Sequence, residues 1–100
     1  MVKLIAIYRK PEDVEAFNEH YFQTHAPLAA KMPGLVKMEV GTIYGTPMGE
    51  SDLHLICEMY FESKEALKAA LSSPEGKASG KDLMGFAGKV VSMHMAEVHE

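Results

Sequence analysis

Two histidines and a proline stand close together in the segment His20–Leu28, "HYFQTHAPL". At about 100° per residue, His25 lies on the apolar stripe of a helix, one turn after Tyr21. Pro27 lacks the N–H that a regular helix needs, so the helix should loosen just after His25. The pattern predicts an imidazole at the inner end of a frayed turn, where it suits a general acid or base.

The other histidine of this segment is expected to play no part in the same site. On a straight helix His20 lies about 140° away from His25, at the edge of the apolar stripe. It is therefore predicted to lie at the surface, and a metal shared by the two rings is not expected, since that needs a spacing of i and i+4. For His25 the alternative is purely structural, a bond to the carbonyl that Pro27 frees at Gln23.

A carboxylate and an aromatic ring share one face of a later helical segment. Asp82 and Phe86 are four residues apart, so Asp82 is expected to point inward with Phe86. There it would orient an imidazole or accept a hydrogen bond from a substrate hydroxyl. The alternative is an ion pair with Lys77 or Lys81.

Three tyrosines and the single cysteine fall on predicted strands. Tyr8, Tyr44 and Tyr60 can each present a hydroxyl at an apolar wall, or simply pack with the hydroxyl at the sheet edge. Cys57 alternates with apolar neighbours and is interpreted as a small buried hydrophobic residue.

The elements that must position these residues follow from periodicity and from helix start signals. The sequence predicts strands over 1–9, 35–44, 52–62 and 89–98, a first helix from about Pro11 to about His25, and further helices that begin at Ser63 and at Ser73-Pro74, the last ending near Gly88. This βαββαβ order predicts an α+β domain with a four-stranded antiparallel sheet and both helices on one face.

Apolar and polar residues alternate less regularly along the predicted strands than along strands of a sheet with one face exposed to solvent. In the third strand Leu55 and Cys57 share one face, and Ile56 and Tyr60 share the other with His54. Two helices cover only one face, so a second copy of the sheet is expected to cover the other, which gives a symmetric homodimer.

Length and composition exclude several classes of protein. The 100 residues suit a single domain, 1–100, and the net charge of −4 without a basic block argues against nucleic-acid binding. One cysteine indicates a reducing cytosol and excludes a disulfide framework, so a cytoplasmic location is expected. No apolar run approaches the ~20 residues of a membrane helix, so no membrane partner is expected.

Two segments resemble one known family. "YRKPEDVEAFNEHYFQTHAPLAAKMPGL" resembles the signature of the EthD family, and "SSPEGKASGKDLMGFAG" is similar to its serine-proline helix start, aspartate and phenylalanine. The resemblance implies a ferredoxin-like subunit that pairs into a dimeric α+β barrel. Relatives in this superfamily include cofactor-free oxygenases, lactone isomerases, polyketide dehydratases and cyclases, and haem-handling enzymes. It also implies His25 as the catalytic residue, while Tyr21 stands where many members have tryptophan.

The resulting functional hypothesis is a small enzyme, without cofactor or metal, that acts by proton transfer on a hydrophobic aromatic or polyketide-like compound. The expected site has His25 as its catalytic residue, and its ligand contacts are Tyr21, Tyr8, Tyr60, Asp82 and Phe86. The rival hypothesis is a non-catalytic module that holds an apolar metabolite for a partner enzyme. Haem handling is a third option.

Overall fold

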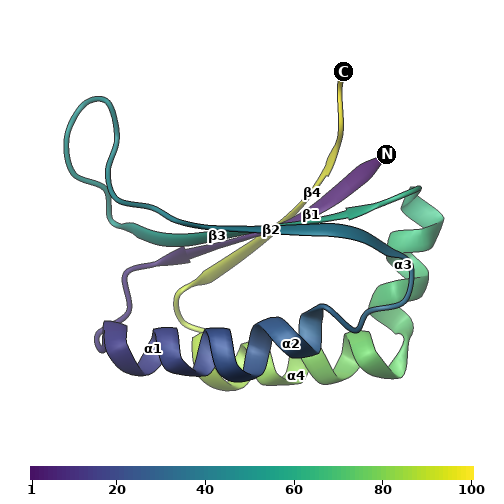
Figure 1. Cartoon of the computed structure of the whole chain (residues 1–100), viewed down its shortest axis with the longest axis horizontal. Helices are drawn as coiled ribbons and strands as arrows, with labels where there is room; N and C mark the ends of the chain where they lie inside the picture. Colours follow the sequence, from purple (N-terminus) through teal and green to yellow (C-terminus); the bar gives the residue numbers. More distant parts are fainter.

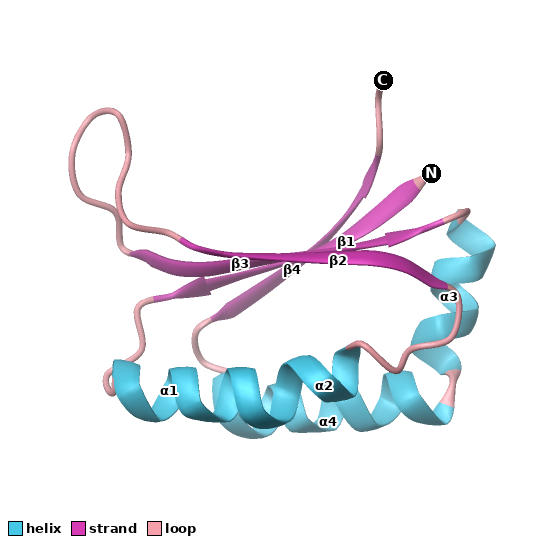
Figure 2. Ribbon diagram, viewed as in Figure 1, coloured by secondary structure: helices cyan, strands magenta, loops and turns pink.

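The computed structural model describes all 100 residues and has two layers, a sheet and a set of helices on one of its faces (Figures 1 and 2). The elements in chain order are β1 (Val2–Arg9), α1 (Val14–His20), the π-helical turn η1 (Tyr21–His25), α2 (Ala26–Ala29), β2 (Leu35–Thr42), β3 (Leu53–Phe61), α3 (Lys64–Ser72), α4 (Pro74–Ala87) and β4 (Val91–Glu97). The strand order is β2-β3-β1-β4 with all neighbours antiparallel, which confirms the predicted ferredoxin-like α+β fold.

The core lies between the sheet and the helices. Alternate residues of β1 and β3 are buried on this side, where they meet the apolar stripes of α1, α3 and α4. Tyr8, Tyr21, Leu55 and Phe61 are the largest side chains that are almost fully buried. Full burial of a Leu or Phe side chain stabilises a fold by about 1.5–3 kcal/mol, so this interface holds the two layers together.

A β-bulge in β3 reverses one side chain. Tyr8 pairs with Leu55 and Arg9 pairs with Leu53, so His54 has no partner on β1. The His54 ring is buried on the helical side, 5.4 Å from the Phe17 ring and 2.7 Å from Asn18 Oδ1. The prediction that His54 shares the opposite face with Ile56 is therefore wrong, because simple alternation ends at the bulge.

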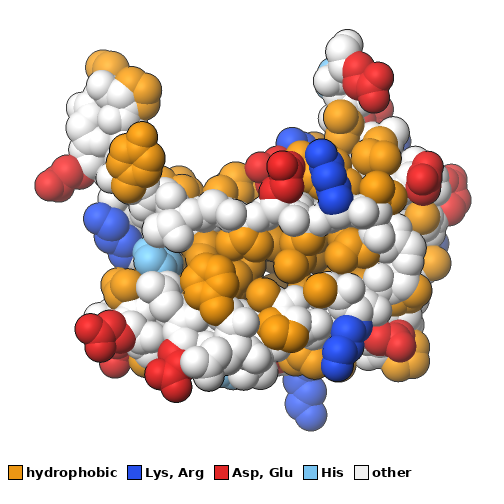
Figure 3. Space-filling model, viewed as in Figure 1, with side chains coloured by type: hydrophobic (Ala, Val, Ile, Leu, Met, Phe, Trp, Pro, Cys, Tyr) orange, Lys and Arg blue, Asp and Glu red, His pale blue; other side chains and the backbone are white.

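The other face of the sheet is not covered by any helix (Figure 1). Ile5, Ile7, Ile56 and Tyr60 lie there half-buried. The loop between β2 and β3 and the C-terminal residues project beyond this bare face, and in Figure 3 they rise from opposite ends of the molecule. In addition, none of the helices has the length and apolar character required to cross a bilayer.

Side-chain caps begin three of the helices. Ser63 Oγ accepts a hydrogen bond from the Ala66 N–H, and Ser73 Oγ accepts one from the Gly76 N–H, as expected from the sequence. Helix α1 begins at Val14 with Asp13 as its cap, three residues after the predicted start at Pro11.

The junction between α3 and α4 leaves no room for a side chain at Gly76. A Cβ placed there would collide with the carbonyl of Ala70 and approach within 2.9 Å of Leu71 Cα. Gly85 differs, because a Cβ at this exposed position of α4 would meet nothing within 4 Å. The tight junction therefore depends on glycine at only one of these two helical positions.

Gly76→Ala should lower the free energy of unfolding by about 1–3 kcal/mol, because the backbone must shift to admit the methyl group. Gly85→Ala is the matched control and should raise it by up to about 1 kcal/mol through helix propensity. Urea unfolding of both variants measures the difference. Equal stability of the two would contradict the close packing at the junction.

Candidate active site

Helix α1, the turn η1 and helix α2 follow one another without a break and form one helical rod, in which η1 is a wider turn. In η1 the hydrogen bonds run from residue i+5 to residue i, and the Ala26 N–H bonds to the Tyr21 carbonyl. Pro27 follows at once and has no N–H to give, so the wide turn accommodates it without a break. The rod continues through α2 to Ala29, and the prediction that the helix loosens just after His25 is wrong.

The wide turn brings the two histidines to the same side of the rod. His20 and His25 are five residues apart, the separation that one hydrogen bond of a π-helix spans. His20 Nε2 lies 2.9 Å from Asp82 Oδ1, and His25 Nδ1 lies 3.0 Å from Asp82 Oδ2. The prediction that His20 points away from the His25 site is therefore wrong, because both rings contact Asp82, although the His20 side chain remains 36% exposed.

Asp82 projects from α4 between the two rings. Its side chain is 19% exposed and makes no ion pair with Lys77 or Lys81. Of the three arrangements considered from the sequence, the structure has the one in which the carboxylate contacts an imidazole. Phe86, one turn later, packs its ring 4.5 Å from His20 and 5.1 Å from His25.

His25 lies at the wall of a small cavity between the helices and the sheet. The residue is 5% exposed, and the cavity holds about 50 Å³, enough for a few water molecules. Tyr8, Cys57 and Met59 line it from the sheet, and Gly80 lines it from α4. The ring therefore borders a cavity between the first helix and the sheet, as expected from the sequence.

The protonation of His25 follows from its surroundings. Burial lowers the pKa of the imidazole below its ordinary 6.5, and the hydrogen bond with Asp82 offsets this only in part. At neutral pH the ring is thus uncharged, with the Nδ1–H donating to Asp82 and the lone pair on Nε2.

Nε2 is the atom of His25 that is available for chemistry. Nε2 makes no hydrogen bond. Every fully buried side-chain nitrogen and oxygen in the chain has a hydrogen-bond partner, so Nε2 must retain some accessible surface. A neutral imidazole held by a carboxylate at one nitrogen, with the other nitrogen open, can accept a proton from a bound molecule.

The buried phenols and the thiol are not acid–base groups at neutral pH. Burial raises the pKa of Tyr8 and Tyr21 well above the ordinary value of 10.0. Burial also raises the pKa of the Cys57 thiol, which agrees with its interpretation as a small buried hydrophobic residue. The Tyr21 ring lies 5.7 Å from the His25 ring and 5.6 Å from that of Tyr8, so these phenols shape the wall around the imidazole.

Tyr60 is the one predicted site residue that lies apart. It is on the bare face of the sheet, with Lys37 Nζ 4.5 Å from its ring centroid and Lys3 Nζ 5.7 Å away. The structure thus brings together His25, Tyr21, Tyr8, Asp82 and Phe86, but not Tyr60. Nowhere do three or more His, Cys, Asp or Glu side chains form a group placed to hold a metal ion.

Sequence reasoning missed His20 as a member of this cluster. The available signal was Pro27 itself, since a proline inside a helix can be accommodated by a wide turn that changes which residues share a face. Ser79 and Gly80, which line the cavity from α4, gave no signal because small residues on a helix serve many purposes.

Comparison with known proteins places the chain in a family. The family model described as "EthD domain" matches residues 9–89. An uncharacterised 11.0 kDa protein from the thcB-thcC intergenic region of Rhodococcus erythropolis is 31% identical over 93 residues, which are 93% of this chain and 90% of the relative. The crystal structure of an ethyl tert-butyl ether D (EthD) family protein from Bacillus halodurans is 56% identical, with a TM-score of 0.97 over 99% of both chains.

More distant structures share the fold. SnoaB of Streptomyces nogalater, described as a cofactor-independent oxygenase, has a TM-score of 0.69 at 14% identity over 99% of this chain and 93% of its own. A dimeric protein of unknown function and ferredoxin-like fold from Bacteroides fragilis has a TM-score of 0.68 at 20% identity over 97% and 95%. The matched segment, the similar relatives and the shared fold lead to one conclusion: the chain belongs to the EthD family.

Proposed function

We propose that this protein is an enzyme that moves a proton at an activated carbon of a small hydrophobic compound, aromatic or polyketide-like, with His25 as the base. The observation that carries the proposal is the Asp82–His25 pair, with Nδ1 bonded to the carboxylate at 3.0 Å and the ring at the wall of an apolar cavity. The step needs only groups that the chain itself supplies.

The proposed step uses each nitrogen of the ring for one task. Nε2 takes the proton from carbon, and the imidazolium that forms is stabilised by the negative charge of Asp82. The proton then returns to another atom of the same compound in an isomerisation, or to a departing hydroxyl in a dehydration. The carbanion left by proton removal can alternatively react with O₂, which then serves as the oxidant; the distant SnoaB structure is described as a cofactor-independent oxygenase.

A proton-exchange assay tests this proposal without knowledge of the final product. Ketones of aromatic and polyketide-like type are incubated with the protein in D₂O, and loss of their activated C–H signals is followed by NMR. The wild-type protein should accelerate exchange, and His25→Gln should slow it by about 10²-fold or more. Asp82→Asn should have an intermediate effect, since it removes the charge that stabilises the imidazolium.

His94→Gln is the matched control, because His94 is exposed on β4, where it pairs with Ile5, and its side chain hydrogen-bonds only to Ser92 Oγ. Its exchange rate should equal that of the wild type. Undiminished exchange in His25→Gln would refute the assignment of the base. A compound that binds but does not exchange would favour the rival function, a non-catalytic binding module.

The lowered pKa of His25 predicts a direction for the dependence of stability on pH. In the unfolded chain this histidine gains a proton near pH 6.5, whereas in the folded protein it stays neutral to a lower pH. Below pH 6.5 the unfolded state therefore binds more protons, and the free energy of unfolding should fall on acidification. His54, whose pKa burial also lowers, adds to the same slope.

Urea unfolding between pH 5.5 and pH 8 measures this slope, and His25→Gln should make it shallower. A wild-type protein that gains stability on acidification would mean that His25 is protonated in the fold, as part of a charged pair with Asp82. His25 would then be unable to act as a base at neutral pH.

We also infer that two copies pair through the bare face of the sheet. Ile5, Ile7 and Ile56 form an apolar strip there that no helix covers, and the description of the Bacteroides fragilis relative as dimeric agrees with this pairing. Such a face buries apolar area only against another apolar face.

Ile7→Asp should convert the dimer to a monomer, because it places an unpaired charge in the proposed interface. Val14→Asp is the control, which introduces the same charge at a residue 40% exposed at the start of α1. Light scattering of the three proteins at equal concentration gives their masses. A wild-type monomer, or an unaffected Ile7→Asp dimer, would refute the interface.

A further inference from the structure

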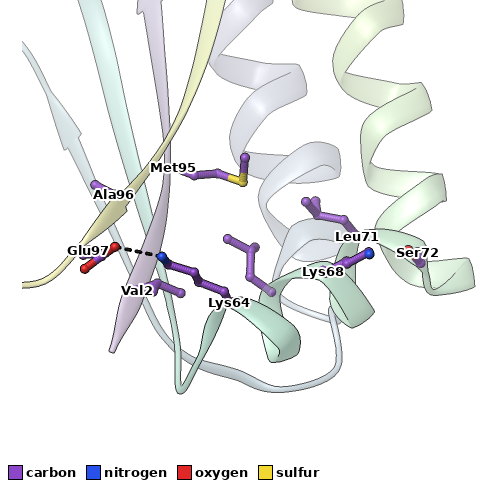
Figure 4. A pocket seen from close by; sticks show the side chains of 9 residues that line it. Val2, Lys64, Lys68, Leu71, Ser72, Met95, Ala96 and Glu97 are labelled. Atoms are coloured by element: carbon purple, nitrogen blue, oxygen red, sulfur yellow. Dashed lines mark ion pairs between the residues drawn. The ribbon is translucent and has the colours of Figure 1, made fainter.

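An open apolar groove runs beside the candidate site, between α3 and β4. It has a volume of about 520 Å³. Val2, Leu67, Leu71 and Met95 form its apolar surface, and Figure 4 shows Leu71 and Met95 facing the hollow from opposite sides. No segment of the chain fills it.

The groove and the cavity at His25 are neighbours. Leu71 lines both of them. On the sheet, Met95 of the groove pairs with Leu4 of the cavity, and the next inward residue of β4, Met93, pairs with Ala6 of the cavity. The two hollows are therefore consecutive stretches of one path along the inner face of β1 and β4.

The boundary between the two stretches is made of adaptable side chains. Leu71, Met93 and Met95 are 40%, 41% and 71% exposed, which is unusual for large apolar residues. Methionine side chains repack readily around apolar ligands. On the opposite wall, a Cβ at Gly80 would meet nothing within 4 Å, so the cavity owes part of its space to this glycine.

The rim of the groove carries one cation without a partner. Lys64 is paired with Glu97 at 2.8 Å, as drawn in Figure 4. Lys68, one turn further along α3, also lines the groove but belongs to no ion pair. Lys68 lies beside Leu71 and Ser72 at the rim (Figure 4). An apolar channel with an uncompensated ammonium at its rim suits a molecule that is apolar along its length and anionic at one end.

We infer that the substrate is an elongated amphiphilic anion: its anionic group lies at Lys68, its apolar body follows the groove past Leu71, and its far end enters the cavity beside His25. This inference rests on the proposed function, and it names the substrate class and the direction from which the substrate enters. Binding alone tests it, so it can fail or succeed separately from the chemistry.

Calorimetric titration of the full chain with octanoate, decanoate and dodecanoate, each below its micelle concentration, is the test. Affinity should rise about fourfold for each CH₂ that is buried. Gly80→Met should abolish the gain of the longer chains and leave octanoate unchanged, because the added side chain fills the cavity. Gly85→Met, on the exposed face of α4, is the matched control and should bind all three acids as the wild type does.

Lys68→Met tests the anionic end. It should weaken dodecanoate by about twofold to fivefold and leave the uncharged 1-dodecanol unaffected. Unfolding midpoints confirm that each variant is folded, and Gly80→Ala gives a second, smaller filling of the cavity if Gly80→Met is unstable.

Three results would overturn the inference: no binding of any of the acids, equal chain-length dependence in Gly80→Met and the wild type, or no effect of Lys68→Met. Dissociation of a wild-type dimer by Met95→Lys would also overturn it, since the groove would then hold a second copy. These outcomes concern binding alone, whereas the proton-exchange assay tests the chemistry, so the failure of one can be told from the failure of the other.

Discussion

The arrangement of the site depends on one turn of helix with i+5 hydrogen bonds. Without the wide turn at Tyr21–His25, the two histidines would point in different directions and Asp82 could meet only one of them. The turn also solves a local problem, because Pro27 cannot donate the bond that a regular helix requires. A backbone constraint at a single residue thus sets which side chains converge on the cavity, and α4 supplies the carboxylate that they share.

Much of the fold could be predicted because its signals are local and repeated. Alternation along β1 and β3, the serine caps of α3 and α4 and the order of the elements indicated the topology. The wrong predictions about His54, His20 and the end of the first helix all arose where the periodicity changes by one residue. His54 lies in the bulge of β3, and His20 precedes the wide turn of the first helix. Regular periods of 2 and 3.6 residues misplace side chains at such points.

The candidate site was predictable in part for the same reason. His25, Tyr21 and Asp82 lie on stripes that point into the core, so a helical wheel found them. Tyr60 also alternates correctly, but the sequence did not say which of the two sheet faces borders the cavity. That choice depends on which face the helices cover, a tertiary property. The cavity itself arises from small residues such as Gly80, which periodicity does not distinguish from other helical positions.

The shared carboxylate has a consequence for how charge is distributed in the site. Asp82 contributes one negative charge and touches two rings, each of which can become a cation. Burial is the main cause of the lowered pKa of His25, and repulsion from His20 adds to it. Because one carboxylate can balance only one positively charged ring, the shared contact disfavours the form in which both rings are charged.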